Sequence, residues 1–337
     1  MERLHLAGAG AVTTKTIRLI DCINPKPHMF LNSRDSLVNC EKWTDLSADQ
    51  WIKTEIPRAV RGGVVVIASI GHTLPESSRL AEPVAASGAA MIELVSYDEA
   101  DLIPMVTDIR RRVKCPVLVK LSPNGKRFLE TAQRCVAAGA DAITACDSLG
   151  PVLRIDIRTG RPALAGANGT GWLSGRAIKP VILQRVAELR NSLTCPIIGL
   201  GGVMEAADAI EMAMAGATFV GLCTALILRG PEYLSKLRSD TEKMLDELGY
   251  ANFASVSGVA LQYLRQPEQT SPLKFAYVAS KCIHCGQCVK TCCYQARSLS
   301  TDGTMDVDIE KCHYCGLCVD VCPTRALTFC KEDPEHV

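Results

Sequence analysis

Short apolar runs recur along the first two thirds of the chain, and a stretch with helical spacing follows each of them. Seven runs occur, at residues 11–17, 64–70, 90–95, 116–121, 142–146, 196–200 and 219–222. They are short, continuous and rich in β-branched residues, which is typical of strands buried on both faces of a parallel sheet. The repeated alternation of strand and helix therefore predicts an α/β fold.

The segments between these runs have the features of helices. In residues 176–190, Pro180 lies early enough for a first helical turn to tolerate it. The apolar positions that share one face there are Ile178, Val181, Ile182, Val186 and Leu189. Gly88, Gly139 and Gly216 each precede a strand and predict left-handed caps that end the preceding helix. Residues 232–248 predict a long polar helix.

Units of about thirty to forty residues favour a (β/α)8 TIM barrel over an open doubly wound sheet. Only seven strands are found, so we expect the first βα unit to be missing or truncated. The barrel is predicted to occupy residues 1–250, followed by a connector over residues 251–273. From residue 274 the composition becomes rich in cysteine, which predicts a small separate domain over residues 274–337.

Length and charge exclude several classes of protein. A chain of 337 residues suits one barrel and a small appendage. The 37 Lys and Arg residues nearly balance the 36 Asp and Glu residues, which predicts neither a nucleic-acid nor an anionic-membrane partner. No apolar run approaches the ~20 residues of a membrane span. The first 14 residues lack the apolar stretch of a signal peptide, so we expect a cytoplasmic protein.

Cysteine is the most unusual component of the composition. The chain has 17 Cys residues, and ten of them lie between Cys282 and Cys330. One run has the spacing C-x2-C-x2-C-x3-C, and it recurs 30 residues later, followed by Pro323. This spacing is that of bacterial ferredoxins with two [4Fe–4S] clusters, in which the fourth Cys of each run binds the other cluster. The predicted ligand sets are Cys282, Cys285, Cys288 and Cys322 for one cluster, and Cys312, Cys315, Cys318 and Cys292 for the other.

Alternatives to this assignment concern the metal and one ligand. Structural zinc sites use two separated Cys pairs rather than four thiols in one run that is repeated. The first run ends in Cys292-Cys293 where the ferredoxin pattern has Cys-Pro, so Cys293 competes with Cys292 as the ligand. The spacing favours Cys292 because it matches Cys322. His284 and His313 are expected beside the clusters rather than as ligands.

Two clusters close together carry single electrons, which predicts a flavin in the barrel, since flavin accepts electrons singly and delivers them in pairs. Phosphate in such barrels is often held by the loops after the last two strands. Gly201-Gly202 and Cys223-Thr224 follow these strands here. Lys15 and Lys120 lie at strand ends, where a cation facing the flavin would stabilise its reduced ring. The alternative for each lysine is that it reaches solvent.

Several segments occur together in one order along the chain. They cover residues 10–16, 24–27, 119–124, 173–175, 201–202 and 223–225. In these segments the chain resembles the dihydroorotate dehydrogenase family, and the ferredoxin domain makes it most similar to the C-terminal part of dihydropyrimidine dehydrogenase and its bacterial catalytic subunit. The resemblance implies an FMN-binding barrel in which Lys15 and Lys120 contact the flavin. It also implies that the FMN phosphate is surrounded by Gly175, Gly201, Gly202, Cys223 and Thr224.

The chain departs from the family at positions that bind the pyrimidine ring. The loop after the fourth strand of the family reads Glu-Leu-Asn-x-Ser-Cys-Pro, whereas residues 93–99 contain no Cys and have Val95 in place of Asn. Asp147 and Ser148 replace an Asn-Thr pair, and Asn39 is the counterpart of another ring-binding Asn. Asn39, Asp147 and Ser148 are thus the expected substrate contacts. Since a site rejects ligands that leave its polar groups unpaired, we expect a substrate other than uracil or dihydroorotate.

Reduction of an activated C=C bond requires an acid that protonates the carbon next to the one that receives hydride. The candidate acids are Asp98, then Tyr97, and third Asp147 or Cys146. A carboxylic acid needs burial to raise its pKa toward neutrality. The alternative for Asp98 is an exposed helix start, where acidic residues are favoured.

The leading hypothesis is an FMN and iron–sulfur oxidoreductase acting on a C=C or C–C bond of a small nitrogen-containing compound, with electrons passing through two [4Fe–4S] clusters. No nicotinamide site is found, so the expected electron partner is an NAD(P)H-dependent flavin reductase subunit or a ferredoxin. Analogy with the family suggests a homodimer. The alternative is a non-catalytic electron-transfer or assembly subunit whose barrel has lost pyrimidine chemistry.

Overall fold

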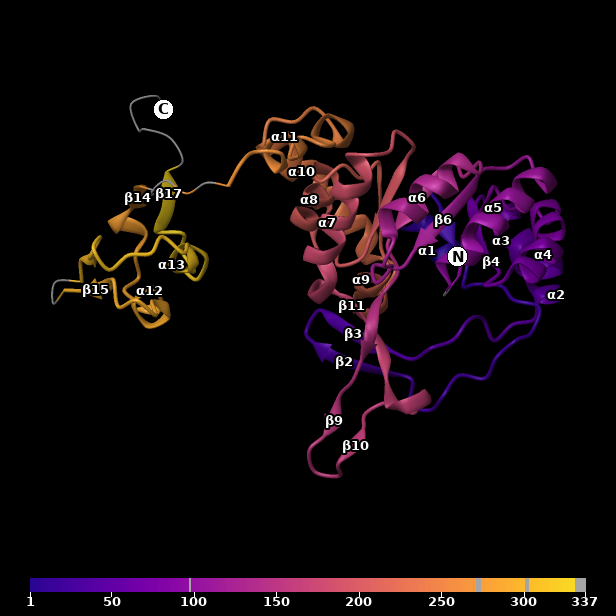
Figure 1. The fold of residues 1–337 in the computed structure, drawn as a ribbon, viewed down its shortest axis with the longest axis horizontal. Coiled ribbons are helices and arrows are strands. Elements are labelled where there is room, and N and C mark those ends of the chain that lie inside the picture. Colours follow the sequence, from indigo (N-terminus) through magenta and orange to yellow (C-terminus); the bar gives the residue numbers. More distant parts are fainter. Residues whose placement is uncertain (97, 269, 271–273, 301–302, 331–337) are drawn as a thin grey trace. The chain divides into compact units, whose positions relative to one another are not determined.

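The computed structural model describes residues 1–96, 98–268, 270, 274–300 and 303–330 (Figure 1). The chain divides into two compact units, Met1–Arg265 and Gln266–Val337. The division falls inside the segment predicted as a connector, because part of that segment packs on the first unit. Phe253 and Val256 contribute to an apolar cluster with Ile210 and Leu245.

All seven predicted apolar runs form strands of one curled parallel sheet in the first unit. In spatial order the strands are β1 (Val12–Thr13), β4 (Val66–Ile70), β5 (Met91–Val95), β6 (Val117–Leu121), β7 (Ala142–Ala145), β12 (Ile197–Leu200) and β13 (Phe219–Gly221). Every neighbouring pair is parallel. Within the described residues β1 and β13 do not pair with each other, so the sheet curls as an incomplete barrel. The predicted fold, a TIM barrel with seven of its strands, is confirmed.

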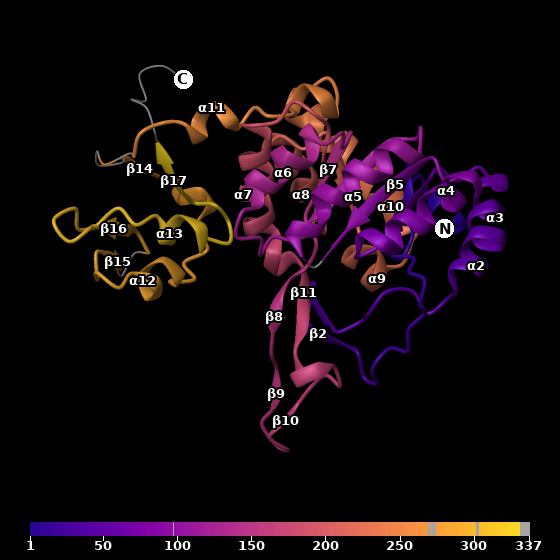
Figure 2. The ribbon, with the colours of Figure 1, turned by 45° about the vertical axis from the view of Figure 1, so that its right-hand side comes forward.

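Helices alternate with these strands and surround the sheet (Figures 1 and 2). The main helices are α3 (Ile56–Arg61), α4 (Leu74–Ala86), α5 (Glu99–Arg112), α6 (Phe128–Ala137), α7 (Lys179–Arg190), α8 (Ala206–Met214) and α10 (Tyr233–Glu247). Shorter helices are α1 (Glu2–Leu6), α2 (Ala48–Gln50), α9 (Thr224–Arg229) and α11 (Leu261–Leu264). Among the described residues, no helix combines the length and apolar character that crossing a bilayer requires.

Local sequence signals account for the ends and faces of these helices. Helix α5 begins after Asp98, has acidic residues in its first turn and ends in three Arg residues, an order that complements the helix dipole. The three glycines at the helix-to-strand joints have φ values of 104°, 108° and 109°, as the caps require. In α7 the predicted apolar face is buried except at Val181, which is 37% exposed.

A second, four-stranded sheet lies beside the parallel sheet and was not predicted. Its order is β2 (Met29–Ser33), β3 (Ser36–Asn39), β11 (Gly171–Gly175) and β8 (Leu149–Val152), and its pairs are antiparallel. The hairpin of β9 (Ile155–Asp156) and β10 (Arg161–Pro162) projects beyond it (Figure 2). Pairing of β3 with β11 sets Gly175 opposite Ser36 and Asn39 opposite Trp172. Two segments far apart in sequence are thereby joined.

Among its described residues, the second unit contains two small antiparallel sheets and two short α-helices. One sheet pairs β14 (Lys274–Tyr277) with β17 (Leu327–Cys330), and the other pairs β15 (Arg297–Leu299) with β16 (Met305–Val307). The helices α12 (Gln287–Thr291) and α13 (Leu317–Asp320) each begin inside a cysteine run. Gly286 and Gly316 precede them in the left-handed conformation, which lets the backbone turn sharply there.

Candidate functional site

A large cavity occupies the interior of the curled sheet, and residues at both the amino and the carboxyl ends of the strands line it. Its volume is about 2030 Å³, above the ~300–1,000 Å³ of ordinary small-molecule pockets. The cavity is this large because it also extends along the inner face of the sheet, where it is bordered by Ile67, Leu118 and Ile198. Phe219 on the edge strand β13 is 58% exposed. The incomplete barrel thus leaves part of its apolar interior uncovered among the described residues.

Nearly all residues predicted for the barrel site border this one cavity. They are Lys15, Asn39, Asp98, Lys120, Asp147, Ser148, Gly175, Gly201, Gly202, Cys223 and Thr224. Tyr97 lies outside the described residues. The parallel topology explains the gathering, because the carboxyl ends of parallel strands meet at one edge of the sheet.

Lys120 is held in this cavity by two carboxylates. Its Nζ lies 3.5 Å from Glu93 Oε1 and 3.6 Å from Asp147 Oδ2. Glu93 is 3% exposed, and Thr144 Oγ1 donates a 2.9 Å hydrogen bond to its other oxygen. Burial by itself would lower the pKa of Lys120, but the Asp147 and Glu93 charges outweigh burial and raise the pKa above its ordinary value. Lys120 is therefore a fixed cation that borders the cavity near the carboxyl end of β6.

Asp147 is held in its ionised form by the same pairing. Burial works to raise the pKa of Asp147, but the Lys120 charge and the Ser148 backbone N–H lower it further than burial raises it. The Ser148 N–H donates to Asp147 Oδ1 at 2.8 Å. An ionised carboxylate carries no proton to give. This geometry suits Asp147 to binding a donor or a cation better than to acting as an acid.

Asp98 occupies the N-cap of α5. Its Oδ1 accepts a hydrogen bond from the Ala100 N–H at 2.9 Å, and its own N–H donates to Ser96 Oγ at 3.1 Å. Asp98 is exposed while also bordering the cavity. The side chain thus has the helix-start position that was the alternative to a catalytic role.

Lys15 and Asn39 are linked through Glu41. Lys15 Nζ lies 2.7 Å from Glu41 Oε2, and the Glu41 N–H donates to Asn39 Oδ1 at 3.2 Å. Lys15 is partly exposed, with 40% of its side chain accessible. The ion pair holds the lysine over the cavity instead of leaving it free in solvent.

Glycines line a further part of the same cavity. Gly175, Gly201 and Gly202 have φ values of 83°, 127° and 86°, a region that side chains rarely adopt. A Cβ on Gly175 would lie 2.3 Å from the Asp35 carbonyl oxygen. Within the described residues, the N–H groups of Gly201, Gly202 and Thr224 donate to no protein acceptor. Free backbone N–H groups in close-packed turns are suited to binding a phosphate.

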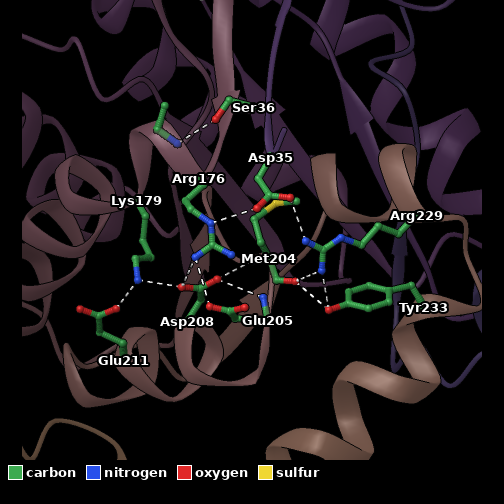
Figure 3. Close-up of polar contacts among 11 residues, drawn as sticks. Asp35, Ser36, Arg176, Lys179, Met204, Glu205, Asp208, Glu211, Arg229 and Tyr233 are labelled. Atoms are coloured by element: carbon green, nitrogen blue, oxygen red, sulfur yellow. Dashed lines mark hydrogen bonds and ion pairs between the residues drawn. The ribbon is translucent and has the colours of Figure 1, made fainter. Parts of the chain in front are cut away.

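A network of ion pairs and hydrogen bonds holds the segments that flank these glycines (Figure 3). Asp35 accepts hydrogen bonds from Arg229 Nη2 at 2.8 Å and from Arg176 Nε at 3.3 Å, and the Arg229 bond is the main reason that the pKa of Asp35 is lowered. Asp208 is 1% exposed and accepts from the backbone N–H groups of Met204 and Glu205 at 2.9 and 3.0 Å. The β2–β3 turn and the segments after β11 and β12 are thereby tied together.

The same network neutralises the cations next to the glycine loops. Lys179 Nζ lies 2.7 Å from Asp208 and also contacts Glu211, and Arg176 Nη1 lies 3.3 Å from Glu205. Since these charges are paired within the protein, an anion in the glycine wall would depend on backbone N–H groups. Thr224 Oγ1 donates to Ser174 Oγ at 2.9 Å and fixes the last of these loops.

Sequence reasoning missed Glu93, Glu41 and His72. A carboxylate and a lysine in adjacent apolar runs, as in Glu93 and Lys120, are a signal that the two side chains pair. His72 follows β4, is 7% exposed and borders the cavity beside Trp43. Burial and the nearby Arg18 charge lower the pKa of His72 to about 4, so its imidazole is neutral near pH 7.

In the second unit, cysteines from both runs line one small cavity. Cys282, Cys285, Cys288 and Cys322 border one small cavity, although Cys322 belongs to the other run. Ala326 N–H donates to Cys322 Sγ at 3.2 Å. Within the described residues, no three Cys, His, Asp or Glu side chains converge at the spacing of a single metal ion.

The last Cys of the first run, Cys292, has the same local structure as the last Cys of the second run, Cys322. Ala296 N–H donates to Cys292 Sγ at 3.3 Å, matching the bond at Cys322, whereas Cys293 is exposed. His313 stacks on Tyr294 with ring centroids 4.1 Å apart.

Comparison with known proteins places both units. Residues 82–245 match the family model described as dihydroorotate dehydrogenase, and residues 281–326 match that of a 4Fe-4S dicluster domain. The chain is 31% identical over 274 residues to the dihydroorotate dehydrogenase B (NAD(+)) catalytic subunit of Methanothermobacter thermautotrophicus, covering 77% of this chain and 89% of the relative. The subunit of the same name from Geotalea uraniireducens is 32% identical over 276 residues, with the same coverage. That of Exiguobacterium sibiricum is 44% identical over 160 residues, or 46% of this chain and 50% of the relative. The chain therefore belongs to the dihydroorotate dehydrogenase family, and it joins the FMN-dependent barrel of that family to a domain for two [4Fe–4S] clusters.

Proposed function

We propose that this protein is an iron–sulfur flavoprotein oxidoreductase that reduces or oxidises a carbon–carbon bond of a small nitrogen-containing compound. The observation that carries the proposal is the Lys120 cation, held by Glu93 and Asp147 in the same cavity as glycine loops with free N–H groups. A fixed cation and a phosphate-binding wall are the two features that an anionic flavin nucleotide requires.

The residues of the cavity fit FMN in two groups. Lys15 and Lys120 would contact the flavin ring, where the Lys120 cation stabilises negative charge. The phosphate would be surrounded by Gly175, Gly201, Gly202, Cys223 and Thr224. When bound, FMN supplies a ring that exchanges hydride with carbon and single electrons with iron–sulfur clusters.

The second unit would hold the clusters with the ligand sets given by the cysteine spacing. The shared cavity of Cys282, Cys285, Cys288 and Cys322 supports the first set. Cys312, Cys315, Cys318 and Cys292 form the second set. The hydrogen bond at Cys292, which repeats the one at Cys322, supports Cys292 over Cys293 as the ligand.

The substrate would differ from that named for the relatives. Val95 is 5% exposed and borders the cavity at a position where the family has a ring-binding Asn. Asp147 brings a carboxylate to the expected substrate position, and a carboxylate repels anionic ligands. A neutral or cationic compound with N–H donors suits Asn39, Asp147 and Ser148 better than dihydroorotate, which is an anion.

The candidate proton donors are Asp98, Tyr97 and Asp147. Asp147 would act as a binding group, because its pairing with Lys120 keeps it ionised. Asp98 borders the cavity from the N-cap of α5, from which it would reach a bound substrate. Tyr97 is the remaining candidate.

Electrons would reach the clusters from another protein. The relatives are named as catalytic subunits that use NAD(+). We therefore favour an NAD(P)H-dependent flavin reductase subunit as the partner of this chain, with a ferredoxin as the second choice. A homodimer would follow the analogy with the family.

The test is cofactor analysis followed by substrate reduction. Protein purified without oxygen should release about one FMN per chain and contain iron and sulfide for two [4Fe–4S] clusters. With dithionite as the electron source, it should reduce unsaturated nitrogen heterocycles of neutral or positive charge. Iron and sulfide without flavin would contradict the proposal and support the electron-transfer or assembly subunit.

A further inference from the structure

The second unit is built from two similar halves that are offset by 30 residues. In each half the N–H of an Ala donates to the thiol of the last Cys of the run. These bonds are Ala296 to Cys292 at 3.3 Å and Ala326 to Cys322 at 3.2 Å. A strand begins at the next residue in both halves. The halves can therefore be compared position by position.

The two halves differ at that next residue. Arg297 begins β15 and is 4% exposed, whereas Leu327 begins β17 and is 2% exposed. Since the fold accepts an apolar side chain at this place in one half, packing alone does not require an arginine in the other. A buried cation at this position needs an electrostatic explanation.

The surroundings of Arg297 contain sulfur and an aromatic ring. Its Nη1 donates to Met305 Sδ at 3.2 Å, and its Nη2 donates to Cys318 Sγ at 3.4 Å. The guanidinium carbon lies 4.2 Å from the centroid of the Phe275 ring. In the part of the chain that the structure describes, no Asp or Glu forms an ion pair with Arg297.

This arrangement lacks a counter-charge until a cluster is bound. A guanidinium stays protonated at every accessible pH, and its burial is costly without an opposite charge. Cys318 belongs to the second proposed ligand set, and a cluster held by four thiolates is anionic. Reduction of the cluster adds one electron and one further negative charge. A cation that also donates a hydrogen bond to a ligand sulfur stabilises the reduced form more than the oxidised form.

We propose that Arg297 is a positioning residue that makes the two clusters unequal, by raising the reduction potential of the cluster bound through Cys318 above that of its neighbour. Leu327 adds no charge to the cluster bound through Cys322. The Arg297 charge also acts on Cys288 of that set, but among the described residues its hydrogen bonds go to Met305 and Cys318. A single electron entering the unit would then rest on the Cys318 cluster, with no proton taken up. The inference rests on the proposed ligand sets and is independent of the flavin and substrate.

The test is a redox titration of both clusters in the full-length protein. Iron and sulfide are measured first, and the clusters are then titrated with dithionite while electron paramagnetic resonance follows each reduced cluster. The wild type should show two separate one-electron steps. Arg297→Gln removes the charge but keeps an N–H donor. It should lower the higher of the two reduction potentials by at least about 59 mV, which corresponds to a tenfold change in the equilibrium constant of a one-electron reduction.

Two further variants make the test specific. Arg297→Leu installs the residue found at the matching position and should produce a shift at least as large. Lys290→Gln removes an exposed cation from α12 of the same unit, and should shift the potentials far less because solvent screens it.

Three results would overturn the proposal. The first is equal potentials of the two clusters in the wild type, which needs no variant. The second is an Arg297 variant with full iron content in which the higher of the two reduction potentials is unchanged, or in which only the lower reduction potential shifts. The third is a shift in Lys290→Gln that equals the shift in Arg297→Gln. Absence of FMN would refute the proposed function while leaving these potentials measurable.

Discussion

Lys120 on β6 and Glu93 on β5 form an ion pair inside the sheet, with 3.5 Å between Nζ and Oε1. Their side chains are 16% and 4% exposed. The pair lies at the carboxyl end of the sheet, where Asp147 approaches Lys120 from the next strand along. A cation fixed in this way contributes both to the stability of the barrel and to the charge of the cavity.

Removal of the Lys120 charge should affect stability and flavin content together. Lys120→Met leaves Glu93 as a buried carboxylate without its cation, so the free energy of unfolding should fall by about 3 kcal/mol in urea titrations. FMN release on purification should increase. The double variant Lys120→Met with Glu93→Gln should regain part of the stability but not the flavin. Equal flavin content in the wild type and both variants would contradict a role for Lys120 in FMN binding.

The glycine wall should not tolerate a methyl group. Gly175→Ala places a Cβ 2.3 Å from the Asp35 carbonyl oxygen at a φ of 83°, so the loop must shift and FMN occupancy should fall by tenfold or more. Gly160→Ala is the matched control, because Gly160 also has a positive φ of 69° but its Cβ would meet nothing within 4 Å. Both variants are examined by flavin fluorescence after denaturation. Full occupancy in Gly175→Ala would exclude this loop from the phosphate site.

Asp98→Asn separates capping from proton donation. Asn caps helices as well as Asp does, so the free energy of unfolding should change by less than about 0.5 kcal/mol. If Asp98 is the acid, substrate reduction should be abolished while photoreduction of the flavin stays normal. Asp98→Ala, which loses the cap as well, should cost about 1 kcal/mol of stability. Unchanged turnover in Asp98→Asn would leave Asp98 with its capping role alone.

His72 should make the barrel less stable as the pH falls from about 6.5 to about 4. Its pKa is lowered from 6.5 to about 4 in the folded state by burial and by Arg18, so the unfolded chain binds the proton more tightly in this range. The full contribution is about 3 kcal/mol. His72→Asn should remove that part of the pH dependence, seen by comparing urea titrations of both proteins at pH 7 and pH 5. If the free energy of unfolding falls equally between pH 7 and pH 5 in both proteins, His72 is not the source of this pH dependence.

The ligand at the end of the first cysteine run can be decided by serine substitutions. Cys292→Ser should lose most of one cluster, since it removes a ligand of the second proposed set. Cys293→Ser should keep both clusters because Cys293 is exposed and lacks the Ala296 hydrogen bond. Iron content and the dithionite-reduced spectrum report the outcome. Loss of a cluster only in Cys293→Ser would reverse the assignment.

Features encoded by neighbouring residues could be predicted without the structure. The seven strands, the left-handed caps at Gly88, Gly139 and Gly216, and the buried face of α7 follow from local periodicity and from the conformational freedom of glycine. The gathering of residues from several strand ends around one cavity could also be predicted, because the carboxyl ends of parallel strands meet at one edge of the sheet. The exception on α7, Val181, depends on what lies next to the helix, which periodicity does not report.

The sequence alone determined the order of the seven parallel strands and their helices and the cysteine spacing, because short-range patterns encode them. The parallel topology then implied which residues meet at the carboxyl edge of the sheet. Only the tertiary structure decided that Lys120 pairs with Glu93 and Asp147 and that Arg297 faces Cys318. Such partners depend on strand register and on packing between distant segments. A charge in an apolar run shows that a partner must exist, but the fold chooses which residue it is.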